Sequence, residues 1–149
     1  MVAVVQLTRY FLPSMVERKD GKILNISSVA SFMAGPKMSL YYASKAFVKS
    51  FSEAIADELK GTGVTVTALL PGPTSTSFEQ ASEMKNSKMF TLLRPLKANK
   101  VAEKGHRAVK KGKVLCYCGA VTKLAAFGSR ILPRATMKKI AKKVNGGQK

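Results

Sequence analysis

Side chains that ligate metals are scarce in this chain of 149 residues. It has two cysteines, Cys116 and Cys118, and a single histidine, His106. The two cysteines alternate within one expected strand, so they share a face and cannot easily form a disulfide with each other. A second cysteine pair is also missing, which excludes the usual zinc-binding patterns. We therefore predict no metal site and two reduced thiols, as is typical of cytoplasmic proteins.

Long apolar runs and acidic side chains are rare as well. No apolar stretch is long enough to span a membrane, and Met1–Val5 lacks the basic start and cleavage site of a signal peptide. The chain has 8 Asp and Glu against 26 Lys and Arg. Residues 94–149 hold 16 basic and 1 acidic side chain, whereas residues 1–93 hold 10 and 7. The reduced thiols favour a cytoplasmic location. The charge asymmetry predicts that the carboxyl-terminal part contacts an anionic surface or polymer, and a peripheral contact with a membrane is one form of this.

Apolar periodicity predicts alternating helices and strands in one domain over residues 1–149. Apolar runs at 22–26, 64–70 and 114–118 predict three buried strands. Such alternation gives an α/β architecture with a parallel sheet that binds ligands at the carboxyl ends of its strands. Residues 120–149 form the basic helical tail of the same domain. Helical spacing recurs over 1–19, 39–60, 98–110 and 121–144, and the last stretch is broken at Pro133.

One stretch, residues 21–45, carries most of the candidate chemistry. Its strand ends at Ser28, and its helix carries Tyr41 and Lys45, which lie on the same helical face because they are four residues apart. Free tyrosine has a pKa of about 10, too high for a base at neutral pH. An ammonium about 4 Å away favours the phenolate by about 4 kcal/mol. The pattern therefore predicts Tyr41 as a general acid/base and Ser28 as the group that holds a substrate oxygen.

Each member of this pattern also has a purely structural interpretation. A Tyr-x-x-x-Lys pair alone is typical of a surface helix, and a serine at a strand end is typical of a cap or turn. Tyr42 is a second phenol, but it lies only three residues before Lys45, and we assign it to packing. The combination is far more specific than any of its members.

That combination resembles the short-chain dehydrogenase/reductase family, in which an active serine precedes the tyrosine of Tyr-x-x-x-Lys by the separation found between Ser28 and Tyr41. The resemblance implies an NAD(P)-dependent oxidoreductase that moves a hydride between a nicotinamide cofactor and a carbonyl or secondary alcohol. It also implies a Rossmann-like, doubly wound open parallel sheet. Further matching positions are Asn25, Ser27, Ala43, Ser44, Ala46, Phe51, Ser52, Glu58, Leu59, Pro71 and Gly72.

The same resemblance implies the cofactor contacts. Tyr41 and Lys45 would contact the cofactor, with Lys45 on the nicotinamide ribose. The strand end Pro71-Gly72 and a threonine four residues after the glycine, Thr76, would touch the nicotinamide end, with Thr74 as a neighbour. The cofactor is expected to be NAD or NADP. Without that context the threonine loop is typical of a plain turn.

The family begins with a βαβ unit whose Thr-Gly-x-x-x-Gly-x-Gly turn holds the cofactor's pyrophosphate, and this sequence contains no such turn. The resemblance therefore covers the carboxyl-terminal portion only, with about three strands and flanking helices, and lacks the amino-terminal βαβ half. We expect a partial sheet with an unpaired edge at its first strand, and a chain that is inactive as given. The polar, methionine-rich residues 78–95 are either a flap over the substrate or a surface helix with a loop.

Partners are expected at two surfaces. By the resemblance, helices 1–18 and 39–60 pack against their copies in a homo-oligomer. In the tail, apolar residues recur at helical spacing between Lys123 and Arg130, which suits an interfacial helix on an anionic membrane. A helix that caps the sheet and carries solvated lysines is the other interpretation. The apolar residues are Leu124, Phe127, Ile131 and Leu132.

Nucleic acid is not expected as a partner, because the tail has only Tyr117 and Phe127 to stack on bases. The main alternative to the oxidoreductase is a non-catalytic fragment whose basic tail binds a membrane surface or another anionic partner.

Overall fold

Three parallel strands form the main sheet in a computed structural model, which describes residues 1–75 and 95–146. Their order is β1–β2–β5, with β1 at Gly21–Ile26, β2 at Val64–Pro71 and β5 at Leu115–Cys118. A second, two-stranded pair joins β3 and β4. The remaining elements are α1 (Val2–Glu17), η1 (Val29–Phe32), α2 (Ser39–Glu58), β3 (Thr74–Ser75), β4 (Leu96–Lys97), α5 (Ala98–Lys110), α6 (Ala120–Ile131) and α7 (Arg134–Val144).

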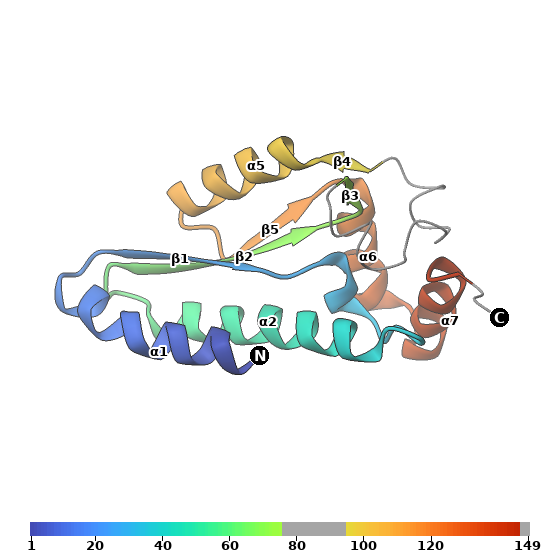
Figure 1. Cartoon of the computed structure of the whole chain (residues 1–149), viewed down its shortest axis with the longest axis horizontal. Helices are drawn as coiled ribbons and strands as arrows, with labels where there is room; N and C mark the ends of the chain where they lie inside the picture. Colours follow the sequence, from blue (N-terminus) through green and yellow to red (C-terminus); the bar gives the residue numbers. More distant parts are fainter. Residues whose placement is uncertain (76–94, 147–149) are drawn as a thin grey trace.

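Helices cover both faces of the sheet, with α1 and α2 on one face and α5 on the other (Figure 1). The central strand β2 is buried along nearly its whole length, as expected for a strand covered on both sides. On one face Val64 and Val66 pack with Ile55 of α2 and with side chains of α1. On the other face Leu69 packs with Val101 of α5. This confirms the α/β architecture with an open parallel sheet.

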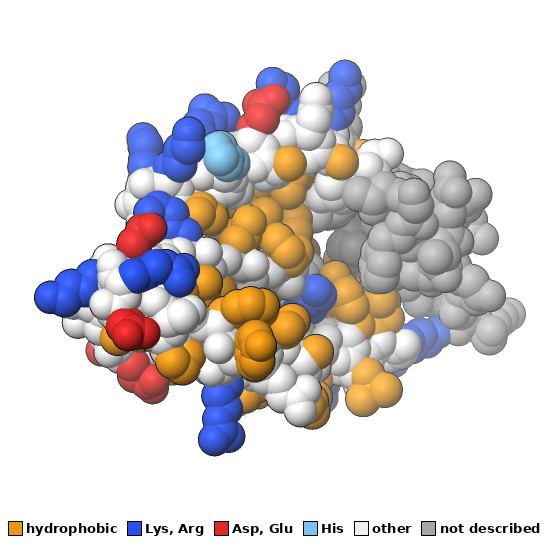
Figure 2. Space-filling view, turned by 60° about the vertical axis from the view of Figure 1, so that its left-hand side comes forward, with side chains coloured by type: hydrophobic (Ala, Val, Ile, Leu, Met, Phe, Trp, Pro, Cys, Tyr) orange, Lys and Arg blue, Asp and Glu red, His pale blue; other side chains and the backbone are white. Residues whose placement is uncertain are grey.

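Strand β1 lies at an edge of the described sheet. It pairs in parallel with β2 over its full length, from Gly21 beside Val64 to Ile26 beside Leu69. Its alternate side chains Leu24 and Ile26 remain 39% and 50% exposed. Hydrophobic side chains gather below the basic side chains of α5, on the side of the molecule where β1 and α1 lie (Figure 2). In the described part of the chain, the other edge of β1 therefore has no strand beside it, as predicted.

Helices α6 and α7 lie beyond the carboxyl ends of the strands (Figure 1). Pro133 separates them and is the N-cap residue of α7, where an N–H would have no partner within the helix. Within the described residues, no helix combines the length and apolarity needed to cross a membrane.

The helices and strands predicted from periodicity are confirmed to within a few residues. Two features were not predicted, the single turn η1 and the parallel pair formed by Thr74–Ser75 and Leu96–Lys97. Thr76 and nearly all of the stretch 78–95 lie outside the described residues, so the predicted cofactor contact of Thr76 and the flap are not described.

Candidate active site

The carboxyl end of β1 places two serines at the centre of the molecule. Ser28 is buried, and its Oγ accepts a hydrogen bond of 3.2 Å from the Ala30 N–H, which caps η1. The cap turns the chain sharply after the strand, so that η1 leaves the sheet while the Ser28 side chain stays at its edge. Ser28 thus serves as a cap, which agrees with the purely structural interpretation of a serine at a strand end. Its side chain also lines a cavity.

Helix α2 presents Tyr41 and Lys45 from its first turns to this strand end. The Lys45 Nζ donates a 3.0 Å hydrogen bond to the Ile26 carbonyl and lies 5.8 Å from the centroid of the Tyr41 ring. At that distance an ammonium interacts favourably with an aromatic ring. Burial lowers the pKa of Lys45. The lysine is therefore held between the strand end and the phenol, as the one-turn spacing predicts.

A set of polar side chains fixes α2 lengthwise against β1. The Ser27 hydroxyl donates a 2.8 Å hydrogen bond to the Lys45 carbonyl. The Asn25 amide donates one of 2.9 Å to the Ser52 Oγ, which itself donates to the Val48 carbonyl. Asn25, Ser27 and Ser52 were noted in the sequence as matching positions but were given no role. They position Tyr41 and Lys45 relative to the strand end.

The opposite wall comes from the end of β2 and from α5. Pro71 ends the strand, and the Gly72 N–H donates to the Cys118 carbonyl at 3.3 Å. A Cβ at Gly72 would lie 3.2 Å from Thr122 Oγ1, so glycine suits this close approach. The Thr74 hydroxyl donates a 2.9 Å hydrogen bond to the Gly72 carbonyl and thereby closes the turn.

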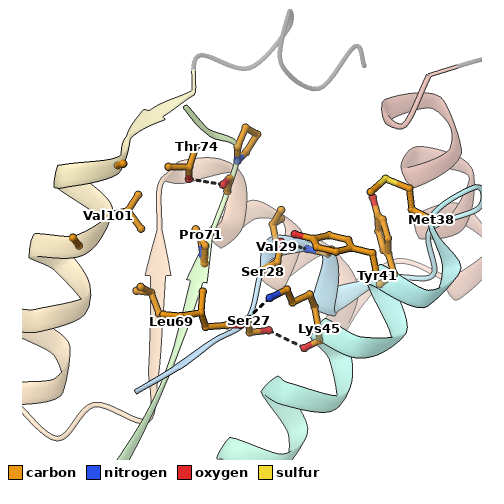
Figure 3. Close-up of a pocket in the computed structure, with 17 residues that line it drawn as sticks. Ser27, Ser28, Val29, Met38, Tyr41, Lys45, Leu69, Pro71, Thr74 and Val101 are labelled. Carbon is orange, nitrogen blue, oxygen red and sulfur yellow. Dashed lines mark hydrogen bonds between the residues drawn. The ribbon is translucent and has the colours of Figure 1, made fainter. Parts of the chain in front are cut away.

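Between these two walls lies a cavity of about 420 Å³, within the range of small-molecule sites (Figure 3). The structure brings together all the described candidate residues on its lining. Much of the remaining lining is apolar and comes from elements whose contribution the motifs do not reveal. The candidates are Ser28, Tyr41, Lys45, Pro71, Gly72 and Thr74, and the apolar residues include Val29, Ala30, Met38, Leu69 and Val101.

Tyr42, the competing phenol, is buried, and its hydroxyl donates a 2.7 Å hydrogen bond to the Asn145 Oδ1. The Asn145 amide in turn donates to the Pro36 carbonyl at 2.9 Å. Burial raises the pKa of Tyr42, although the Asn145 bond acts in the opposite direction. A Cβ at Gly35 would collide with the Tyr42 ring, so the Gly35-Pro36 loop packs directly on it. These contacts agree with the packing role assigned to Tyr42.

The cavity offers a hydroxyl, a phenol and an ammonium on one side and a glycine-containing turn on the other. The donors fit a sugar hydroxyl and a polar substrate oxygen, and Pro71 and Gly72 line the other side of the same cavity. The residues therefore fit the nicotinamide end of a dinucleotide. In sequence, the chain has no glycine-rich turn for the pyrophosphate.

Comparison with known proteins gives the family. A model described as short chain dehydrogenase matches residues 1–87. The chain belongs to the short-chain dehydrogenase family. The family consists of NAD(P)-dependent oxidoreductases, and the match includes the strand end with Ser28, the helix with Tyr41 and Lys45, and the Pro71–Thr74 turn.

Curated relatives support this assignment. A very-long-chain 3-oxoacyl-CoA reductase of Bos taurus is 46% identical over 70 residues, which is 47% of this chain and 22% of the relative. The reductase of the same name in Anas platyrhynchos is 41% identical over 83 residues, 56% of this chain and 27% of the relative. The ketoacyl reductase HetN of Nostoc sp. is 43% identical over 72 residues, which is 48% of this chain and 25% of the relative. The chain thus matches about a quarter of the length of these relatives.

Solved structures share the fold. A short-chain dehydrogenase from Sphingobium yanoikuyae in complex with NADPH has a TM-score of 0.72 and 26% identity, covering 87% of this chain and 51% of that one. A 7beta-hydroxysteroid dehydrogenase has a TM-score of 0.79 at 19% identity, and the match covers 95% of this chain and 55% of that one. At this identity it supports the fold alone. The chain therefore spans about half the length of these two proteins.

Proposed function

We propose that this chain supplies the catalytic part of an NAD(P)-dependent oxidoreductase that interconverts a carbonyl compound and a secondary alcohol. The observation that carries the proposal is the convergence of Ser28, Tyr41 and Lys45 on one cavity, opposite the Pro71–Thr74 turn. Each of these side chains alone has an ordinary structural explanation. Their meeting at the carboxyl end of a parallel sheet, where such sheets bind ligands, does not.

In the direction of reduction, the substrate oxygen accepts hydrogen bonds from the Ser28 and Tyr41 hydroxyls. As negative charge develops on that oxygen, Tyr41 transfers its proton to it, and a phenolate remains. Lys45 stabilises the phenolate, because its ammonium is held close to the ring in a half-buried position where electrostatic attraction is stronger than in water. When bound, a reduced nicotinamide would supply the hydride to the carbonyl carbon, so that this hydride and the Tyr41 proton together would convert the ketone to the alcohol.

Lys45 and the Pro71–Thr74 turn are the residues proposed to hold the nicotinamide end of NAD or NADP. The Sphingobium yanoikuyae relative, whose structure contains NADPH, supports a dinucleotide of this kind. We expect the 149 residues by themselves to bind NADH and NADPH only weakly, because they contain no pyrophosphate turn. Calorimetric titration measures this, and a micromolar dissociation constant, about −8 kcal/mol, would contradict it.

For the substrate, we propose a ketone with an apolar body, such as a 3-oxoacyl compound. Apolar side chains provide much of the cavity lining, including Val29, Leu69 and Val101. A second cavity of about 320 Å³ shares Val29, Ala30 and Tyr42 with the first and is lined almost wholly by apolar residues. The relatives named as very-long-chain 3-oxoacyl-CoA reductases and as a ketoacyl reductase point to the same class.

The proposal is tested with the full gene product that carries these 149 residues. Oxidation of NADH and of NADPH is followed with 3-oxoacyl thioesters of increasing chain length and with a short polar ketone as the control. We expect kcat/KM to rise with chain length. If no carbonyl compound is reduced with either cofactor, the proposed function is wrong. If the short polar ketone is the better substrate, only the substrate class is wrong.

A further inference from the structure

The outer surface of α6 and α7, here called the α6–α7 face, exposes large apolar side chains. On α6, Leu124, Phe127 and Ile131 are 69%, 65% and 64% exposed. They recur at i, i+3 and i+7, so they form one stripe along the helix. On the opposite side of α6, Thr122 and Ala126 are buried against the protein. The stripe is therefore a surface feature of a helix that the core already holds in place.

Basic side chains border this stripe. Lys123 and Arg130 are exposed, and at their spacing they lie together on one flank of the stripe. Helix α7 packs through Met137 and Ala141, which are buried, and turns its lysines outward. The outward cations of α7 are Lys138, Lys139, Lys142 and Lys143.

The cations of the α6–α7 face are not used in ion pairs within the described residues. Residues 120–146 contain seven Lys and Arg and no Asp or Glu. The four ion pairs in the described part of the chain lie elsewhere, in or beside α1, β1, α2 and α5. An exposed apolar stripe with seven cations on the same two helices is complementary to a partner that is both anionic and apolar.

We propose that the α6–α7 face docks on an anionic phospholipid bilayer. An apolar stripe bordered by Lys and Arg is the composition of helices that lie in a membrane interface, where lipid headgroups pair with the cations and acyl chains receive the apolar side chains. A second copy of the chain would bring the same cations face to face across a two-fold interface, which is repulsive. A nucleic acid would meet Phe127 alone as an aromatic side chain on this stripe.

Docking would also place lipid next to the site. The apolar cavity of about 320 Å³ is lined by Leu124, Leu132 and Ile140 of the α6–α7 face and by Val29 and Ala30, which also line the catalytic cavity. The two cavities therefore adjoin at Val29 and Ala30, and docking would bring the bilayer close to the catalytic cavity. This consequence rests on the proposed function, whereas the docking itself does not.

The test is flotation of the 149-residue chain with phosphatidylcholine vesicles and with vesicles that also contain phosphatidylglycerol. We expect the chain to float with the anionic vesicles only, and high salt to weaken the binding. Circular dichroism checks that each variant folds. Flotation needs neither cofactor nor turnover, so failure of the proposed function leaves this test unaffected.

Two variants separate charge from apolar contact. In the first, Lys139→Gln, Lys142→Gln and Lys143→Gln on α7 should lower vesicle partitioning by about a hundredfold, at about 1 kcal/mol for each lysine. Its control has the same charge change at the far end of α5, with Lys110→Gln, Lys111→Gln and Lys113→Gln, all exposed. The control should lower partitioning less than about threefold, because its lysines lie far from the proposed contact.

In the second variant, Phe127→Ser and Ile131→Ser should lower partitioning at least about tenfold. Its control, Val114→Ser just before β5, replaces an exposed apolar residue away from the α6–α7 face and should bind vesicles like the parent. The proposal is overturned if the parent fails to float with anionic vesicles, floats equally with neutral ones, or loses binding equally with the α5 control. A change of oligomeric state in Phe127→Ser/Ile131→Ser, with vesicle binding unchanged, would show that a second copy covers the face.

Discussion

Lysines on α2 and on α7 occupy opposite situations. Lys45 is half-buried, bonds a main-chain carbonyl at 3.0 Å and lies against an aromatic ring. Lys139, Lys142 and Lys143 are exposed. Buried polar atoms that form hydrogen bonds keep their side chains in fixed positions, and proton transfer requires fixed positions. Exposed cations are instead available to an external partner. The catalytic wall formed by β1, η1 and α2 and the α6–α7 face should therefore respond differently to substitution, and five changes test this.

Tyr41→Phe should have the largest effect. In the full gene product we expect kcat to fall by about a thousandfold or more with the fold unchanged, because phenylalanine keeps the packing but carries no proton. Tyr42→Phe is the matched control, since its hydroxyl bonds Asn145 rather than a substrate. Steady-state kinetics measure both. A Tyr41→Phe enzyme that retained more than about a tenth of the parent rate would contradict the assigned role.

Lys45→Ala should come next. Without the ammonium the phenolate is less stable, so alcohol oxidation should require a higher pH, and cofactor affinity should fall as well. Lys45→Arg keeps the charge and should restore part of the pH profile. The measurement is kcat/KM for oxidation against pH. If the profile of Lys45→Ala matched that of the parent, the lysine would not act through Tyr41.

The catalytic wall could be found from the sequence because its residues are close along the chain. Ser28, Tyr41 and Lys45 lie within one strand–turn–helix unit, where strand ends and helical spacing fix their approximate positions. The parallel three-stranded sheet followed equally well, because three apolar runs alternate with helices and parallel strands require such crossovers. The order of its strands was not predicted.

The features that the sequence did not reveal depend on pairing over long distances or on very short elements. Thr74 pairs with Leu96, and Tyr42 bonds an asparagine 103 residues away. Two-residue strands and the four-residue η1 have no periodicity to detect. The hydrogen bonds of Lys45 and Ser27 to main-chain carbonyls likewise leave no signal in the sequence, because every residue has the same main-chain carbonyl.

The outer face of α1 is a second exposed apolar surface, and it can be compared with the α6–α7 face. It exposes Leu7, Tyr10 and Phe11 at 58%, 78% and 50%, yet α1 contains only one basic and one acidic side chain. An apolar face with few cations suits a second copy, and we propose self-association through α1 and α2. Leu7→Asp with Phe11→Asp should weaken the dimer at least about thirtyfold by sedimentation, as for a central interface residue. Phe127→Asp on α6 should leave it intact, and equal effects would contradict the proposal.

Asn145 joins the two regions, since it follows α7 and bonds Tyr42 of α2 and the Pro36 carbonyl. Asn145→Ala should lower the free energy of unfolding by about 1–3 kcal/mol, because the buried Tyr42 hydroxyl loses its partner. Tyr42→Phe removes the hydroxyl together with its need for a hydrogen-bond partner, so it should lower the free energy of unfolding by only about 0.5–1.5 kcal/mol. Urea unfolding measures both. If Tyr42→Phe cost as much as Asn145→Ala, the bond would not be what holds α7 against the catalytic wall.

The smallest effect concerns alkaline pH. Burial raises the pKa of Tyr42 above its usual 10.0, so folding favours the neutral phenol. The stability that Tyr42 contributes is then complete below about pH 10 and is lost as pH rises through the folded pKa. Lys45 acts with the opposite sign in the same range, because burial lowers its pKa and its cost to folding shrinks as pH rises toward 10.5.

The dependence of the parent's free energy of unfolding on pH therefore contains two opposing contributions. Only the difference between the parent and a variant without the Tyr42 hydroxyl isolates the contribution of Tyr42. We expect the free energy of unfolding of the parent minus that of Tyr42→Phe to be constant at neutral pH and to decrease above about pH 10, since phenylalanine does not titrate. Urea unfolding at a series of alkaline pH values gives this difference. A difference that stayed constant across that range would mean that Tyr42 titrates alike in the folded and unfolded chain, and that its hydroxyl is not shielded between α2 and α7.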